Sequence, residues 1–138
     1  MKKIVLDKET VQMLCLFEQC TQTHAKDCIT LDEQLIFIVP TGEIGRAIGK
    51  GGQHIKRLEQ KLRKRIKIIE YHQELSEFVK SVIAPLEIAD LRLETDTLYL
   101  TAKDLKTRGM LIGRGASHLR LFESIIQRYF PIKQIKVT

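Results

Sequence analysis

Disulfide-forming cysteines and long apolar runs are both scarce in this sequence. The three cysteines, Cys15, Cys20 and Cys28, are odd in number and show no metal-ligand spacing, which argues for a reducing compartment and against a disulfide framework. We expect them to be small, buried apolar residues. The sequence has no run of 18 apolar residues and no apolar leader segment, so neither membrane spanning nor secretion is supported. A cytoplasmic protein is expected.

Aromatic residues are also few, with five Phe, three Tyr and no Trp. Proteins that bind single-stranded nucleic acid on a stacking platform carry several aromatic side chains in one strand motif. No segment that is predicted to be a strand supplies such a motif. Stacking platforms of the RRM or OB type are therefore excluded.

Length and charge limit the class of protein. A chain of 138 residues with 43% hydrophobic content is typical of a globular protein. Lys and Arg number 23 against 17 for Asp and Glu, an excess of six positive charges. Such an excess favours a polyanionic partner without identifying one.

A segment of ten residues occurs twice, 64 positions apart. Residues 47–56 read AIGKGGQHIK, and residues 111–120 read LIGRGASHLR. This repeat predicts a duplicated unit, with a first domain at residues 1–72 and a second at residues 73–138. Units this small bury only about 60% of the surface of their unfolded chains. We therefore expect the two units to share an interface.

Hydrophobic periodicity and turn residues predict the same element order, helix, strand, strand, helix, helix, strand, in both units. In the first unit Asp7 is the expected N-cap, and the first helix is expected to present Val11, Leu14, Cys15 and Glu18 on one face. The predicted elements of this unit cover residues 7–23, 27–31, 35–39, 43–48, 53–64 and 65–70, with a turn at residues 32–33. Those of the second unit cover residues 75–83, 88–94, 98–102, a helix capped by Asp104, 117–129 and 132–137.

Both copies of the repeat place a basic residue between two glycines, as GKG at residues 49–51 and GRG at residues 113–115. Glycine removes the side chain that would hold a ligand away from the backbone, and a helix start offers unpaired N–H groups and a positive dipole end. Such a turn suits a phosphate. An ordinary junction between two helices is the alternative, but the recurrence of the cation favours the phosphate.

Two other glycine-rich motifs do not fit the first turn. A P-loop has four residues between its first glycine and Gly-Lys, followed by Ser or Thr. Here only three residues separate Gly45 from Gly49, and Gly51 follows Lys50. The G-x-G-x-x-G dinucleotide fingerprint fails because His54 stands in the place of its last glycine.

The motif that fits is the KH-domain turn, Ile-Gly-x-x-Gly-x-x-Ile, which clamps the backbone of about four nucleotides. Residues 48–55 match it in full, and residues 112–119 depart from it at Ala116, where the family has glycine. A methyl group there would hold the backbone farther from a phosphate, so we expect the second turn to bind less well. The element order resembles the prokaryotic, type II variety of this domain. The predicted fold is α+β, with two tandem type II KH domains.

Cations next to the turns complete the predicted binding site. A basic run at residues 56–67 is interpreted as a helix face that captures nucleic acid, with a merely solvated face as the alternative. The resemblance implies that base edges meet exposed strand backbone beside an aliphatic groove, which we expect from Ile44, Ile48 and residues 66–69. The predicted RNA-binding residues are Arg46, Gly49, Lys50, Gly51, Gly52, Gln53, Lys56, Arg57, Gly113, Arg114, Gly115, Ala116, Ser117 and Arg120.

Catalytic and metal-binding groupings are lacking. The four histidines, His24, His54, His72 and His118, pair with no Cys, Asp or Glu at a recognisable ligand spacing. His54 and His118 are equivalent in the repeat and are expected to face the surface or the nucleic acid. No catalytic triad, Cys-His pair or carboxylate pair recurs in both copies. Glu43 and Asp104 are interpreted as helix-start residues. We predict no enzyme activity, no cofactor and no metal.

Three segments carry a closer resemblance, at residues 42–50, 65–70 and 77–87. They resemble the tandem KH segment of the NusA family of transcription termination and antitermination factors, and the likeness extends over roughly residues 30–138. Bacterial members add a polymerase-binding domain and an S1 domain. The chain is therefore expected to be similar to the short archaeal form.

The resemblance implies a function in transcription termination or antitermination through binding of single-stranded RNA. Contact with RNA polymerase or a transcription complex is left open, and no membrane partner is expected. One alternative is an RNA-binding factor in ribosome assembly, since the same domain serves there. The other is an adaptor whose KH units contact protein, which the departure at Ala116 favours.

Overall fold

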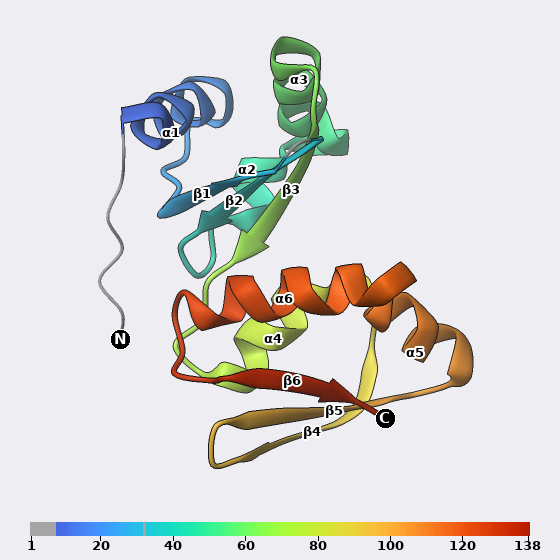
Figure 1. Ribbon diagram of the computed structural model, residues 1–138. Coiled ribbons are helices and arrows are strands. Elements are labelled where there is room, and N and C mark those ends of the chain that lie inside the picture. The colour runs from blue at the N-terminus through green and yellow to red at the C-terminus, as the bar shows by residue number, and fades with distance from the viewer. Residues whose placement is uncertain (1–7, 32) are drawn as a thin grey trace. The chain divides into compact units, whose positions relative to one another are not determined.

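The computed structural model describes residues 8–31 and 33–138 (Figure 1). The chain divides into two compact units, of which one ends at His72 and the other begins at Gln73. Each unit contains a three-stranded sheet and helices, so the predicted α+β class is confirmed. The expected N-cap Asp7 and the turn residue Asp32 lie outside the described residues.

The first unit is built on a sheet in the order β1-β2-β3, with β1 antiparallel and β3 parallel to the central strand. A short 3₁₀ turn, η1, joins two of its helices. Its elements are α1 (Lys8–Thr21), β1 (Asp27–Thr30), β2 (Gln34–Val39), α2 (Ile44–Ile48), η1 (Lys50–Gly52), α3 (Gln53–Leu62) and β3 (Arg65–Glu70).

The core of the first unit corrects the predicted face of α1. Phe17 is fully buried and its ring stacks on that of Phe37 in β2, with ring centroids 4.4 Å apart. This contact turns Phe17 and Cys20 inward and leaves Cys15 exposed. The predicted stripe through Val11, Cys15 and Glu18 is therefore wrong. Residues 13–17 are apolar at every position, so periodicity alone could not select the buried face.

The second unit repeats this plan with a sheet in the order β4-β5-β6. Figure 1 shows its three α-helices on one side of this sheet. Phe78 is fully buried and contacts Tyr129 and Phe130, each at a centroid distance of 5.5 Å. The elements are α4 (Leu75–Ile83), β4 (Ile88–Glu94), β5 (Thr97–Ala102), α5 (Leu105–Ile112), η2 (Arg114–Ala116), α6 (Ser117–Gln127) and β6 (Gln134–Val137).

Several elements end earlier than their predicted bounds. The first helix ends at Thr21 because Gln22 adopts a left-handed φ of 59°, and α3 ends at Leu62 because Arg63 has a φ of 54°. The basic run at residues 56–67 is thus not one helix face, because residues 65–67 lie in β3. The helix α6 ends at Gln127.

The two predicted helix-start acids behave differently. Asp104 accepts a hydrogen bond from the N–H of Thr107 at 2.7 Å, which holds the pKa of its carboxyl below the usual range. Its predicted cap is confirmed. Glu43 also stands at the N-cap position of its helix, α2, so its predicted place at a helix start is confirmed, but its side chain forms no cap hydrogen bond and instead pairs with Arg46 at 3.4 Å.

Candidate nucleic-acid interface

The first glycine turn joins α2 to α3 through three left-handed residues. Gly49 has φ 78° and ψ 167°, a region that glycine alone occupies readily, and Gly51 and Gly52 have φ values of 63° and 74°. The chain therefore reverses within a few residues and exposes its backbone at Lys50 and Gly51.

Two consecutive N–H groups at the tip of this turn are available for a ligand. Within the turn, Gly49 donates to the Gly45 carbonyl and Gly52 donates to the Gly49 carbonyl. The N–H groups of Lys50 and Gly51 find no acceptor in the described part of the chain. They lie at the start of α3, where the helix dipole favours an anion.

The second turn repeats this geometry between α5 and α6. Gly113 has φ 72° and ψ 176°, and Gly115 has φ 60°. Ala116 adopts φ 61° and ψ 25°, close to the conformation of Gly52. The N–H groups of Arg114 and Gly115 again have no acceptor among residues 8–31 and 33–138. The departure from the motif at Ala116 therefore preserves the backbone path.

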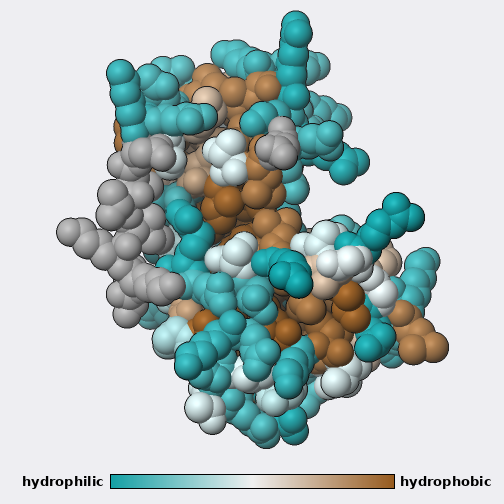
Figure 2. Space-filling view, in the orientation of Figure 1, coloured by the Kyte–Doolittle hydropathy of each residue, from teal (hydrophilic) through white to brown (hydrophobic). Residues whose placement is uncertain are grey.

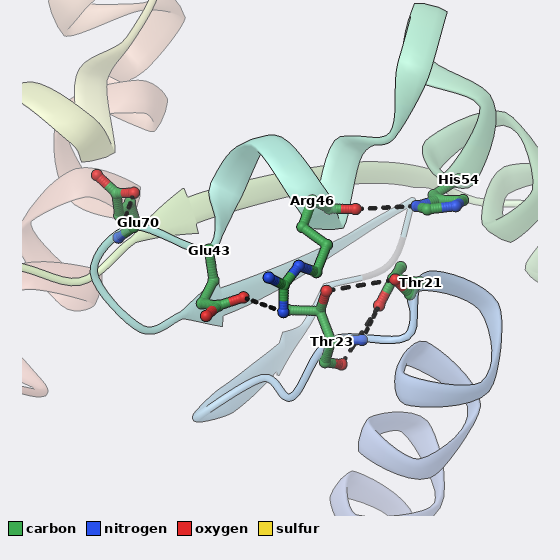
Figure 3. Close-up of polar contacts among 7 residues, drawn as sticks. Thr21, Thr23, Glu43, Arg46, His54 and Glu70 are labelled. Atoms are coloured by element: carbon green, nitrogen blue, oxygen red, sulfur yellow. Dashed lines mark hydrogen bonds and ion pairs between the residues drawn. The ribbon is translucent and has the colours of Figure 1, made fainter.

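Exposed cations surround the first turn. Lys50, Lys56 and Arg57 are exposed, and none forms an ion pair with another residue that the structure describes. Arg46 is exposed as well, but it pairs with Glu43 (Figure 3). Figure 2 shows the hydrophilic side chains that project over α3 at the upper right. These charges add an attraction for polyanions to the free N–H groups.

The remaining predicted residues also lie at the two helix starts. Gln53 and Ser117 are the first residues of α3 and α6, and both are exposed. Arg120 is exposed on the first turn of α6 and, like Arg114, has no ion-pair partner in the described residues. All fourteen predicted residues therefore lie in or beside one of the two glycine turns.

The strand next to the first turn presents a free backbone edge. Arg65 donates its N–H to the carbonyl of Glu33 just before β2, and Tyr71 donates its N–H to Val39 in β2. Alternation in the parallel ladder therefore directs the N–H groups of Ile66 and Ile68 away from β2. The N–H of Ile66 is taken by the Glu59 carboxylate at 3.3 Å. The N–H and C=O of Ile68 remain at the edge.

The aliphatic groove that we expected is only partly present. Ile44 and Ile48 are half-buried and pack against the cluster that contains Ile66 and Ile68. Ile69 points to the opposite face of the sheet, because side chains alternate along a strand, and it is fully buried. The expected contribution of Ile69 is therefore wrong.

Sequence reasoning missed a contact that both turns share. His54 Nδ1 lies 3.0 Å from the carbonyl oxygen of Arg46, and His118 Nδ1 lies 2.8 Å from that of Met110. The equivalent positions of the two histidines in the repeat were the available signal. The spacing did not show that each side chain folds back onto the preceding helix.

No group of three His, Cys, Asp or Glu side chains among the described residues could hold a metal ion. None of the helices in the described ranges has the length and apolar content needed to cross a bilayer.

We expect alanine at Gly49 to cost more stability than alanine at Gly51. A Cβ at Gly49 would lie 2.8 Å from His54 Cγ, whereas one at Gly51 would meet nothing within 4 Å. Gly49→Ala should lower the free energy of unfolding by about 3 kcal/mol, because the strained backbone and the clash add. Gly51→Ala should cost only about 1 kcal/mol for its left-handed φ. Urea denaturation measures both, and equal costs would contradict the assigned geometry.

Ala116→Gly is expected to stabilise the protein. Alanine is strained at φ 61°, and removing that strain outweighs the entropy that glycine adds to the unfolded chain. The free energy of unfolding should rise by about 0.5 kcal/mol. The reciprocal variant Gly52→Ala should lower the free energy of unfolding by about 1 kcal/mol. Gly52 has a φ of 74°, and a Cβ added there would meet no atom within 4 Å. A loss of stability in Ala116→Gly would mean that the turn is not left-handed there.

Comparison with known proteins agrees with this geometry. A family model for the KH domain matches residues 15–94. The crystal structure of APE1850 aligns with a TM-score of 0.79 at 27% sequence identity, covering 96% of this chain and 100% of that one. The fold and the glycine turns thus define a protein of tandem type II KH domains.

Curated relatives identify the family more narrowly. The probable transcription termination protein NusA of Methanocaldococcus jannaschii is 32% identical over 99% of this chain and 76% of its own length. Its namesake from Methanococcus vannielii is 33% identical over 98% of this chain and 80% of its own length. The chain belongs to the family of archaeal NusA transcription termination proteins. Members of this family are transcription factors rather than enzymes.

Proposed function

We propose that this protein binds single-stranded RNA through the turns at residues 49–52 and 113–116 and thereby acts in transcription termination or antitermination. The family implies RNA binding, and the relatives named above are described as transcription termination proteins. The transcription complex would be the further partner.

The free N–H pairs at the two turn tips carry this proposal. Lys50 and Gly51 offer two adjacent donors at a helix start, and Arg114 and Gly115 offer two more. A phosphate oxygen accepts such donors strongly because the hydrogen bonds are charge-assisted. The lack of a side chain at Gly51 and Gly115 lets the RNA backbone approach.

Base recognition would use the strand edge rather than aromatic stacking. Ile68 offers one N–H donor and one C=O acceptor beside the half-buried Ile44 and Ile48. In β6 the same role falls to Val137, because Thr138 bonds to Leu100 and Ala102 in β5 and alternation turns Val137 outward. An extended strand of nucleotides could place base edges against these groups while its phosphates contact the turns.

RNA binding is expected to depend strongly on salt. If about four to six phosphates are neutralised by lysines and arginines, log K for a single strand should fall against log salt with a slope of about −3 to −4. Filter binding of a single-stranded RNA pool between low and moderate salt measures the slope, with single-stranded DNA of matched sequence as the comparison. A flat response would refute the electrostatic part of the proposal.

The same measurement separates the protein-contact adaptor from the RNA-binding functions, since an adaptor would not retain the RNA pool. Sequencing of RNA crosslinked to the protein in cells then separates the two RNA-binding functions. Nascent transcripts should predominate if the protein acts in termination or antitermination. Predominance of ribosomal RNA precursors would instead favour ribosome assembly.

A further inference from the structure

Each glycine turn is closed by a histidine from the helix that follows it. His54 Nδ1 contacts the Arg46 carbonyl oxygen at 3.0 Å, and His118 Nδ1 contacts the Met110 carbonyl oxygen at 2.8 Å. Figure 3 shows the first of these contacts, with the ring of His54 directed at the backbone of α2. A carbonyl oxygen can only accept, so Nδ1 must carry the proton in both rings.

The histidine occupies the place of a backbone donor. If α2 continued as a helix, the N–H of Lys50 would donate to the carbonyl of Arg46, four residues earlier. The left-handed Gly49 turns the chain away and leaves that carbonyl without its helical partner. His54 satisfies it instead. The N–H of Lys50 is thereby left free to face a ligand.

In the second unit a histidine side chain again replaces the missing backbone donor. Arg114 would donate to the carbonyl of Met110 in a continuing α5, and His118 takes that acceptor. Between the helices the two copies differ only in Lys50 against Arg114 and Gly52 against Ala116, and both keep this contact.

In both turns the first glycine and the histidine are in close contact, Gly49 with His54 and Gly113 with His118. A Cβ at Gly49 would lie 2.8 Å from both Cγ and Nδ1 of His54, and a Cβ at Gly113 would lie 2.7 Å from Cγ of His118. The imidazole therefore packs directly over the glycine Cα. The first glycine of each turn is needed to admit the ring as well as to reverse the chain.

We propose that His54 and His118 are positioning residues of the phosphate sites. Each donates Nδ1–H to the carbonyl that loses its helical partner at the turn, that of Arg46 or Met110, and so keeps the N–H of Lys50 or Arg114 directed at the RNA. The neutral ring then carries its proton on Nδ1 and leaves Nε2 unprotonated. This inference rests on the proposed RNA binding, but the tautomer can be measured without RNA.

The first test is the ¹⁵N spectrum of the histidine side chains in the RNA-free protein at a pH where the rings are neutral. His54 and His118 should show the tautomer protonated at Nδ1. Protonation at Nε2 in either ring would overturn the inference for that turn, whatever the protein binds.

The second test compares amide variants in RNA binding. His54→Asn places an amide nitrogen close to the position of Nδ1, whereas His54→Gln places it one bond farther from the backbone. His54→Ala and His54→Gln should each weaken binding of single-stranded RNA by about tenfold. This factor corresponds to the loss of about one charge-assisted hydrogen bond, that from the Lys50 N–H to a phosphate. His54→Asn should remain within about threefold of the wild-type affinity.

A control variant at His24, in the segment between α1 and β1, and the alternative outcomes make this test decisive. His24 is exposed and pairs with Glu18, so His24→Ala should leave affinity unchanged. Equal losses in the Asn, Gln and Ala variants, or wild-type binding in His54→Ala, would overturn the positioning role alone. A wild-type protein that binds no RNA would overturn the proposed function, and the positioning role with it.

Discussion

Replacement of Lys50 and Gly51 together by aspartate is expected to weaken binding of single-stranded RNA by at least about a hundredfold. The change removes one cation, adds two anions and sets carboxylates against the phosphate that the two N–H groups would hold. Loss of about 3 kcal/mol from charge-assisted contacts corresponds to that factor. Electrophoretic mobility shifts with a short RNA measure it.

The fold should tolerate this double variant. Both positions are exposed, a Cβ at Gly51 meets no atom within 4 Å, and aspartate enters the left-handed region more readily than most residues. Circular dichroism should therefore be unchanged. The equivalent change at Arg114 and Gly115 should cost less affinity, since the methyl group of Ala116 stands beside that turn. A larger loss of affinity at the second turn would contradict the expectation that the first turn binds RNA more strongly.

A matched charge control is available on α1. Lys8 and Gln12 are exposed near its N-terminus, and a cavity lined by Glu9 and Leu62 places this end of α1 beside the C-terminal end of α3. The turn lies at the other end of α3, about 15 Å away along a helix of ten residues. Lys8→Asp with Gln12→Asp changes the charge equally and should keep most of the affinity.

Phe78→Ala is expected to lower the free energy of unfolding by about 3 to 5 kcal/mol. The ring is fully buried and contacts Tyr129 and Phe130, which follow α6 near the C-terminal end of the chain. Such a loss is comparable with the whole stability of a unit this small. Thermal melting followed by circular dichroism should show it. Phe130→Ala removes a half-buried ring and should cost less.

The same variant tests the expected cooperation between the two units. If they fold as one body, Phe78→Ala should lower the melting temperature of both units in a single transition. A second transition that keeps the wild-type temperature would show that the first unit, which ends at His72, is stable by itself.

Much of the fold was predictable because it depends on local signals. The stretch Leu75–Ile83 has apolar residues at helical spacing and forms α4, with Phe78, Val79, Val82 and Ile83 buried. Asp104 has the chemistry of an N-cap and acts as one. The glycine turns were predictable because the repeat shows the same pattern twice, and recurrence distinguishes a required glycine from an incidental one.

The features that sequence did not predict depend on tertiary contacts. The rotation of α1 is set by the stacking of Phe17 on Phe37 from another element, and this contact leaves Cys15 exposed. The contact of His54 with the Arg46 carbonyl depends on the angle between α2 and α3, which the φ and ψ of Gly49 set. The periodicity of apolar residues in the sequence does not predict the angle between these two helices.

The central claim is that the free N–H groups at the turn tips hold RNA phosphates, and an NMR titration of backbone amides tests it most directly. ¹⁵N-labelled protein would be titrated with a short single-stranded RNA while the amide signals are followed. We expect the amides of Lys50 and Gly51 to show the largest shifts, followed by those of Arg114 and Gly115. RNA binding that moves other amides and leaves these four unchanged would contradict the account.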